Sequence, residues 1–111
     1  MEILIQATGV VVTPALRDAI EEKIGRTTQY APRAVRARVH VRKTSAHASP
    51  DQYVVRVLCE LPGQDLSAEQ SGPDPLAALD TVAEKIERRL RKVKTERLAK
   101  RERNPAKPPR V

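Results

Sequence analysis

Apolar residues between positions 76 and 93 recur at alternating steps of three and four. This spacing places them on one stripe of an α-helix, which turns about every 3.6 residues. Asp74 and Pro75 precede the stripe, and a capping carboxylate followed by proline is typical of a helix start. The pattern predicts one long helix over residues 76–103, which projects or frays beyond Val93, where the stripe ends. The stripe comprises Leu76, Leu79, Ala83, Ile86, Leu90 and Val93.

A shorter helix is expected near the N-terminus. Thr13 and Pro14 repeat the start signal of the long helix, because a threonine hydroxyl can accept from free N–H groups and proline fits the first helical position. Apolar residues then recur every four positions and predict a helix over about residues 14–29. They are Leu16, Ile20 and Ile24.

Four segments have the composition or the alternation of β-strands. In the clearest one, Val and Ala alternate with Arg and His, which predicts one apolar face and one basic face. Pro62 and Gly63 fit the centre of a type II turn between the last two strands, and residues 44–50 are expected to form a loop. The order strand, helix, three strands, helix predicts an α+β domain. The strands are expected at residues 2–7, 35–42, 52–61 and 65–70.

The composition limits the core and the chemistry. The chain has 111 residues, with two Tyr and no Phe or Trp, so we expect one domain with an aliphatic core. Scarce aromatic residues disfavour a surface on which RNA bases stack. Cys59 is the only cysteine, and no segment is typical of a signal peptide or a membrane span. We therefore expect a reduced, cytoplasmic protein without cofactor or metal.

The positive charge is confined to the last third of the chain. Residues 76–111 carry 12 Lys or Arg and 5 Asp or Glu, whereas residues 1–75 carry nine of each. A field this localised indicates a polyanionic partner such as an RNA or DNA backbone, although a solvated helix face with ion pairs accounts for the charge alone equally well. Glu84 with Arg88 and Glu87 with Arg91 have the spacing of helical ion pairs. The flank without acidic neighbours, expected to face the ligand, comprises Lys85, Arg88, Arg89 and Lys92.

Three other classes of function fit the sequence less well. No nucleophile–base constellation, metal-ligand spacing or glycine-rich phosphate loop supports an enzyme. A double-stranded-RNA-binding domain has similar elements, but its basic cluster usually opens the second helix, whereas this helix becomes basic only from Lys85. A module that dimerises through the stripe of the second helix is the remaining alternative. We expect packing on the sheet to occupy that stripe.

Several segments match one known family in order and spacing. They are Thr13-Pro-Ala-Leu-Arg-Asp-Ala-Ile-Glu-Glu-Lys-Ile, Leu61-Pro-Gly, Leu66-Ser-Ala-Glu, Leu76-Ala-Ala-Leu-Asp and Glu84-Lys-Ile-Glu-Arg-Arg-Leu-Arg-Lys-Val-Lys. Together they resemble the ribosome hibernation promoting factors, also called ribosome-associated inhibitors, over roughly residues 2–100. The chain departs from that family at one end of each helix. Thr27 and Tyr30-Ala31 stand in for a leucine and an aromatic pair at the end of the first helix, and Leu76 stands in for a common aromatic residue at the start of the second.

The resemblance implies a β-α-β-β-β-α fold with a four-stranded sheet and both helices on one face. It implies binding to 16S rRNA and neighbouring ribosomal proteins in the decoding channel of the small ribosomal subunit. There the protein would block mRNA and tRNA and inhibit translation in stress or stationary phase, and it would be monomeric off the ribosome. No C-terminal dimerisation domain of the long family form is present, so the chain corresponds to a short-type member or to a piece of a longer one.

The expected rRNA contacts are basic side chains on both helices. Composition adds a disordered, basic, proline-rich tail at residues 102–111, which leaves a ribosome-binding domain at 1–101. The strand pattern, rather than the resemblance, adds Arg36, Arg38 and Arg42 as secondary candidates. The contacts implied by the resemblance are Lys23, Arg26, Lys85, Arg88, Arg89, Arg91, Lys92 and Lys94.

Overall fold

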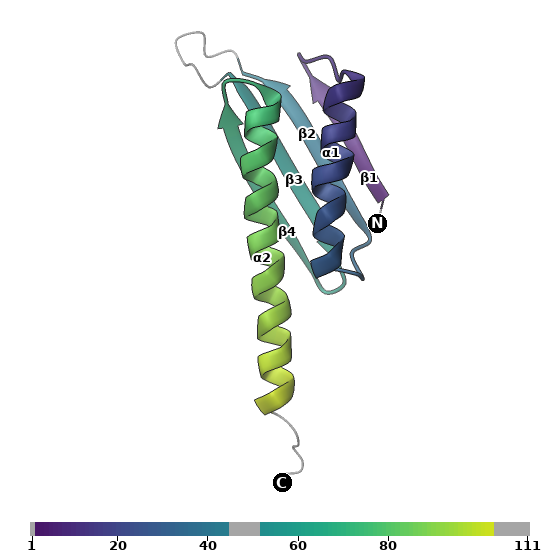
Figure 1. The fold of residues 1–111 in the computed structure, drawn as a ribbon, viewed down its shortest axis with the longest axis vertical. Helices are drawn as coiled ribbons and strands as arrows, with labels where there is room; N and C mark the ends of the chain where they lie inside the picture. Colours follow the sequence, from purple (N-terminus) through teal and green to yellow (C-terminus); the bar gives the residue numbers. More distant parts are fainter. Residues whose placement is uncertain (1, 45–51, 104–111) are drawn as a thin grey trace.

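The protein folds into two layers, a sheet and a pair of helices that cover one of its faces (Figure 1). The computed structural model describes residues 2–44 and 52–103, and their side chains except at 28 and 94–103. Residues 102 and 103 of the expected tail belong to helix α2, which ends at Arg103. Most of the expected loop and the rest of the tail lie outside the described residues. In chain order the elements are β1 (Glu2–Thr8), α1 (Pro14–Arg26), η1 (Thr27–Tyr30), β2 (Arg36–Lys43), β3 (Tyr53–Leu61), β4 (Gln64–Gly72) and α2 (Pro75–Arg103).

The predicted β-α-β-β-β-α fold is confirmed. The strands lie in the order β1-β2-β3-β4, with β1 parallel to β2 and the other neighbours antiparallel. The parallel pair requires a crossover connection, which α1 supplies. α2 lies alongside α1 on the same face and continues past the ends of the strands (Figure 1).

Both predicted helix starts are confirmed by their caps. The Thr13 hydroxyl accepts from the Leu16 N–H at 3.1 Å, and Asp74 Oδ1 accepts from the Ala77 N–H at 2.8 Å. The first helix ends earlier than predicted, at Arg26. The Thr27 hydroxyl donates to the Ile24 carbonyl at 2.6 Å, and the chain continues as the tighter 3₁₀ helix η1.

The core is aliphatic, as the composition predicted. Alternate residues of β2 and β3 meet the apolar faces of both helices, and these side chains are at most 5% exposed. The core therefore needs no aromatic ring to fill the space between the layers. Its central members are Leu16, Ile20, Ile24, Val39, Val41, Val55, Val57, Leu79, Val82, Ile86 and Leu90.

The buried stripe of α2 differs from the predicted one at its start. Leu76 is 45% exposed, whereas Ala78 is fully buried. The cause is a close approach between β4 and α2, since a Cβ on Gly72 would lie 3.1 Å from the Ala78 backbone nitrogen. Ala78 therefore faces the sheet. Leu76, two residues earlier on a helix, points away from it.

Candidate RNA-binding surface

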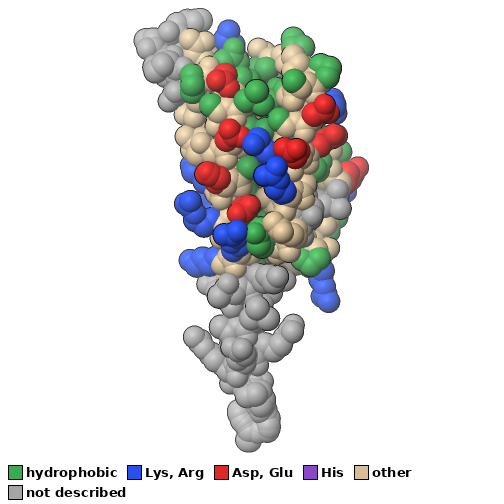
Figure 2. All heavy atoms as spheres, in the orientation of Figure 1, with side chains coloured by type: hydrophobic (Ala, Val, Ile, Leu, Met, Phe, Trp, Pro, Cys, Tyr) green, Lys and Arg blue, Asp and Glu red, His purple; other side chains and the backbone are tan. Residues whose placement is uncertain are grey.

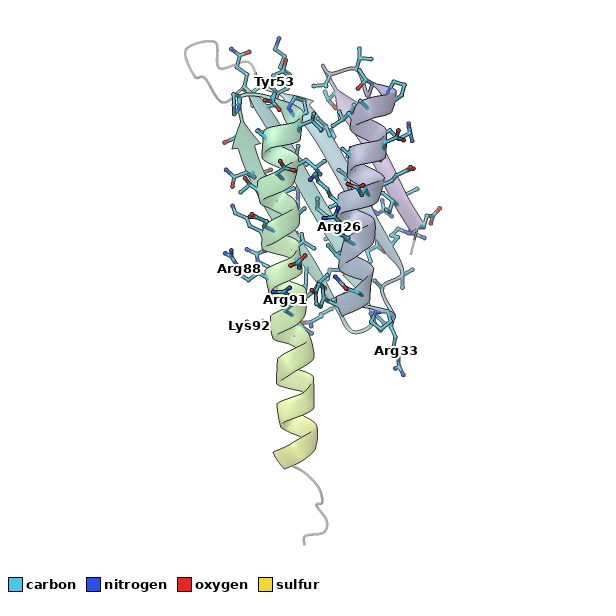
Figure 3. All side chains as sticks on the ribbon, viewed as in Figure 1. Arg26, Arg33, Tyr53, Arg88, Arg91 and Lys92 are labelled. Atoms are coloured by element: carbon cyan, nitrogen blue, oxygen red, sulfur yellow. The ribbon has the colours of Figure 1, made fainter. Side chains whose placement is uncertain are left out.

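Among the described side chains of α2, two cations are exposed and unpaired. Arg88 and Lys92 have neither a carboxylate nor a carbonyl partner among the described residues. They are one helical turn apart and point outward from the same side of α2 (Figure 3). The predicted pair between Glu84 and Arg88 is not among the ion pairs of the described residues, so the Arg88 guanidinium is available to a ligand.

The other two cations of the predicted flank, Lys85 and Arg89, lie at the free edge of β4. The direction in which the backbone hydrogen bonds of the sheet point shows which β4 carbonyls are exposed there. The Thr44 N–H donates to the Gln52 carbonyl across the β2–β3 pair at 2.7 Å. Backbone polar groups alternate sides along a strand, so the odd-numbered residues of β3 bond to β4. Their partners in β4 are even-numbered. The carbonyls of odd-numbered residues in β4 therefore point to the free edge of the sheet.

Lys85 and Arg89 cover this free edge. Lys85 Nζ donates to the Glu69 carbonyl at 3.3 Å and to Gln70 Oε1 at 2.6 Å. Arg89 donates to the Ser67 carbonyl. Charged side chains on an edge strand hinder its pairing with another chain. The flank expected to face a ligand is thus divided, with two cations held on β4 and two directed to solvent.

Arg91 lies on the opposite side of α2, against η1. Its Nη2 donates to the Tyr30 hydroxyl at 2.7 Å and lies 3.2 Å from Glu87 Oε2, which confirms the predicted Glu87–Arg91 pair. The guanidinium carbon lies 4.8 Å from the centre of the Tyr30 ring. The hydrogen bond to Tyr30 is the main factor that raises the pKa of Arg91, so this side chain remains a cation.

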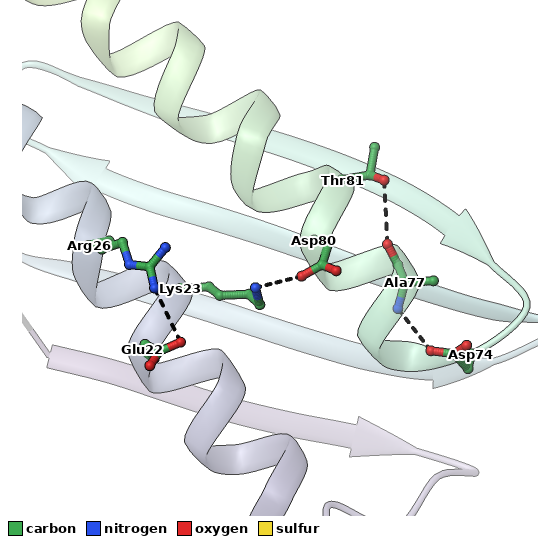
Figure 4. Close-up of polar contacts among 7 residues, drawn as sticks. All are labelled: Glu22, Lys23, Arg26, Asp74, Ala77, Asp80 and Thr81. Atoms are coloured by element: carbon green, nitrogen blue, oxygen red, sulfur yellow. Dashed lines mark hydrogen bonds and ion pairs between the residues drawn. The ribbon is translucent and has the colours of Figure 1, made fainter.

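The two candidates on α1 are paired with carboxylates (Figure 4). Lys23 Nζ lies 2.7 Å from Asp80 Oδ1 on α2, and Arg26 Nη2 lies 3.3 Å from Glu22 Oε1. Figure 2 shows acidic and basic side chains interspersed on the face that both helices form. An RNA phosphate would compete there with an existing partner, so these residues are weaker candidates than Arg88 and Lys92.

The predicted basic face of β2 is balanced by acidic neighbours. The sequence indicates the alternation correctly, but the three arginines face carboxylates on all three other strands. The pairs are Arg36–Glu2 at 3.6 Å, Arg38–Glu60 at 2.7 Å and Arg42–Glu69 at 3.9 Å. The outer face of the sheet is therefore a mixed-charge surface rather than a basic one.

One candidate was missed from the sequence. Arg33 is exposed in the turn after η1 and lies at the same end of the fold as Arg88, Arg91 and Lys92 (Figure 3). The four residues form what we call the basic end. The only signal for Arg33 in the sequence is its place after Pro32. Its position near α2 depends on the path of the connection from α1 to β2, which the sequence pattern does not specify. The Lys94 side chain lies outside the described ones.

The described residues offer little other chemistry. They contain no group of three or more His, Cys, Asp or Glu that could hold a metal ion, and none of their helices is long and apolar enough to cross a membrane. Cys59 is 1% exposed. Burial, with smaller effects from Asp65 and Glu60, raises the pKa of its thiol, which disfavours the reactive thiolate.

Fold and surface together define a class, a two-layer α+β protein with a basic end and an inert interior. The chain belongs to the family described as "Sigma 54 modulation protein / S30EA ribosomal protein", whose model matches residues 3–98. This match confirms the resemblance to the ribosome hibernation factors.

Two curated relatives are named ribosome hibernation promotion factor. The one from Deinococcus radiodurans is 32% identical over 91 residues, which are 82% of this chain and 48% of that protein. The one from Staphylococcus aureus is 34% identical over 92 residues, 82% of this chain and 47% of that protein. The chain thus spans about half the length of these relatives.

Two solved structures have the same fold. The N-terminal domain of Thermus thermophilus Protein Y has a TM-score of 0.71 at 22% identity, with 84% of this chain and 99% of that chain covered. A ribosomal subunit interface protein from Coxiella burnetii has a TM-score of 0.72 at 23% identity, with 86% and 99% covered.

Proposed function

We propose that this chain is a ribosome hibernation factor that binds 16S rRNA in the decoding channel of the small ribosomal subunit. It occupies the space that mRNA and tRNA need and so inhibits translation in stress or stationary phase. It acts in the cytoplasm by binding rather than by catalysis, and it is monomeric off the ribosome.

The observation that carries this proposal is the basic end, in a chain of the Sigma 54 modulation protein / S30EA ribosomal protein family. Arg88 and Lys92 are exposed with no partner among the described side chains, so phosphate contacts there break no existing ion pair. Only two aromatic residues are present, which favours recognition of folded RNA through phosphates and shape over base stacking.

The dimerisation alternative is weakened by the way α2 packs. Leu79, Ile86 and Leu90 are at most 1% exposed because the sheet and α1 already cover them. A heptad seam between two copies would require α2 to leave its own core.

Binding to purified ribosomal subunits tests the proposal. We expect the chain to sediment with small subunits and not with large ones, and to be displaced by mRNA together with initiator tRNA. Arg17→Glu is a control variant that should bind like wild type, because Arg17 is an exposed cation in the first turn of α1, away from the basic end. Equal binding to both subunits, or no competition with mRNA and tRNA, would refute it.

A further inference from the structure

Tyr30 and Arg91 are 61 positions apart in the sequence and form one unit in space. The Tyr30 hydroxyl accepts from Arg91 Nη2 at 2.7 Å, and the guanidinium carbon lies 4.8 Å from the ring centre. The pair joins η1 to α2, and Arg91 lies toward the end of the fold at which the β3–β4 turn lies (Figure 3). A ring face and a hydroxyl contact the same guanidinium, so its position and its plane are both restrained.

The contacts of Arg91 use only part of its binding capacity. A guanidinium has five N–H donors, and both polar partners, Tyr30 and Glu87, are at Nη2. Among the described residues, the donors of Nε and Nη1 have no partner. The side chain is 58% exposed, so more than half of its surface is open to solvent.

We propose that Tyr30 is a positioning residue for RNA binding, which holds Arg91 so that its remaining donors meet a phosphate of the basic end's RNA partner. This inference rests on the proposed function. A flexible arginine loses rotamer freedom when it binds a phosphate, and one that is already held loses less. Tyr30 would therefore raise affinity without touching RNA.

The alternative is that Tyr30 serves packing alone. Its ring is half-buried against the core, so a large truncation would loosen the end of α1 in either case. Tyr30→Phe separates the two roles, because it keeps the ring and removes the hydroxyl that holds Nη2. Tyr53→Phe is the matched control. Tyr53 is the other tyrosine of the chain and lies at the opposite end of the sheet (Figure 3). Lys43 Nζ lies 5.9 Å from the centre of its ring.

A double-mutant cycle with Arg91→Met measures the coupling. Purified small subunits are titrated with wild type, Tyr30→Phe, Arg91→Met and the double variant at several salt concentrations. We expect Tyr30→Phe to weaken binding roughly 3- to 10-fold and to have no effect in the Arg91→Met background. Tyr30→Phe keeps the charge, so its slope of log K against log salt should match wild type. Arg91→Met should make that negative slope shallower by about 0.7–0.9.

The outcomes separate the two proposals. A wild-type chain that does not bind small subunits overturns the proposed function and this inference together. If wild type binds, three results overturn the inference alone. They are wild-type affinity in Tyr30→Phe, wild-type affinity in Arg91→Met, and a Tyr30→Phe effect that persists in the Arg91→Met background.

Discussion

Charge reversal of Arg88 and Lys92 should separate local RNA contacts from the overall charge of the protein. The variant Arg88→Glu/Lys92→Glu lowers the net charge from +7 to +3. The control Arg17→Glu/Arg56→Glu changes the net charge by the same amount at exposed positions outside the basic end. Any difference between the two variants reports where the RNA lies.

The structure sets the expected size of the effect. Neither Arg88 nor Lys92 must leave a partner among the described residues, so each should release close to a full counterion when it binds a phosphate. Two lost contacts make the negative slope of log K against log salt shallower by about 1.4–1.8. Between 50 and 200 mM salt the loss of affinity then becomes about tenfold smaller than for wild type. Arg38, 2.7 Å from Glu60, should contribute less because it must exchange partners.

Equilibrium binding to small subunits, measured by sedimentation or fluorescence anisotropy at five salt concentrations, gives these slopes. Circular dichroism checks that each variant is folded. Equal slopes for the control and the Arg88/Lys92 variant would show that total charge, rather than the basic end, determines binding. An unchanged slope in the Arg88/Lys92 variant would remove both residues from the site.

Three further predictions concern the fold. Asp74→Ala removes the cap of the Ala77 N–H and should cost about 1 kcal/mol, a fall of roughly 4–8 °C in Tm by calorimetry for a domain of this size; an unchanged Tm would show that the cap is dispensable. Lys85→Ser with Arg89→Ser uncovers the β4 carbonyls and should promote dimers or larger assemblies in ultracentrifugation, unlike Arg88→Ser with Lys92→Ser; a monomer would contradict edge protection. The raised pKa of Cys59 means that, above the ordinary thiol pKa, the unfolded thiol ionises while the folded one stays protonated. The free energy of unfolding of wild type, measured by denaturant titration, should therefore fall relative to that of Cys59→Ala as the pH rises from about 8 to 10. Parallel pH profiles of the two proteins would contradict this.

The sequence was sufficient for the features that depend on neighbours along the chain. The Thr13 and Asp74 caps, the alternation in β2 and the apolar face of α1 all follow from local spacing. These patterns repeat with the period of a helix or strand, and the local backbone alone determines that period. Only a few folds with this order of strands and helices could bury the apolar face of every element, so the fold could also be predicted.

The partners of the cations could not be predicted in this way. Arg38 meets Glu60 because of the β2–β3 register, and Lys85 meets β4 because α2 crosses that edge. Ion pairs between distant segments depend on tertiary geometry, so the alternation along β2 overstated the basic character of its outer face. For the same reason Arg33 was missed.

A cryo-electron microscopy structure of this chain bound to the small ribosomal subunit would show which of its surfaces meets the RNA. The account predicts that the basic end faces 16S rRNA in the decoding channel, with Arg88 and Lys92 within hydrogen-bonding distance of phosphates. It also predicts that Lys85 and Arg89 remain on β4. Density that places the outer face of the sheet against the RNA, with Arg88 and Lys92 in solvent, would contradict it.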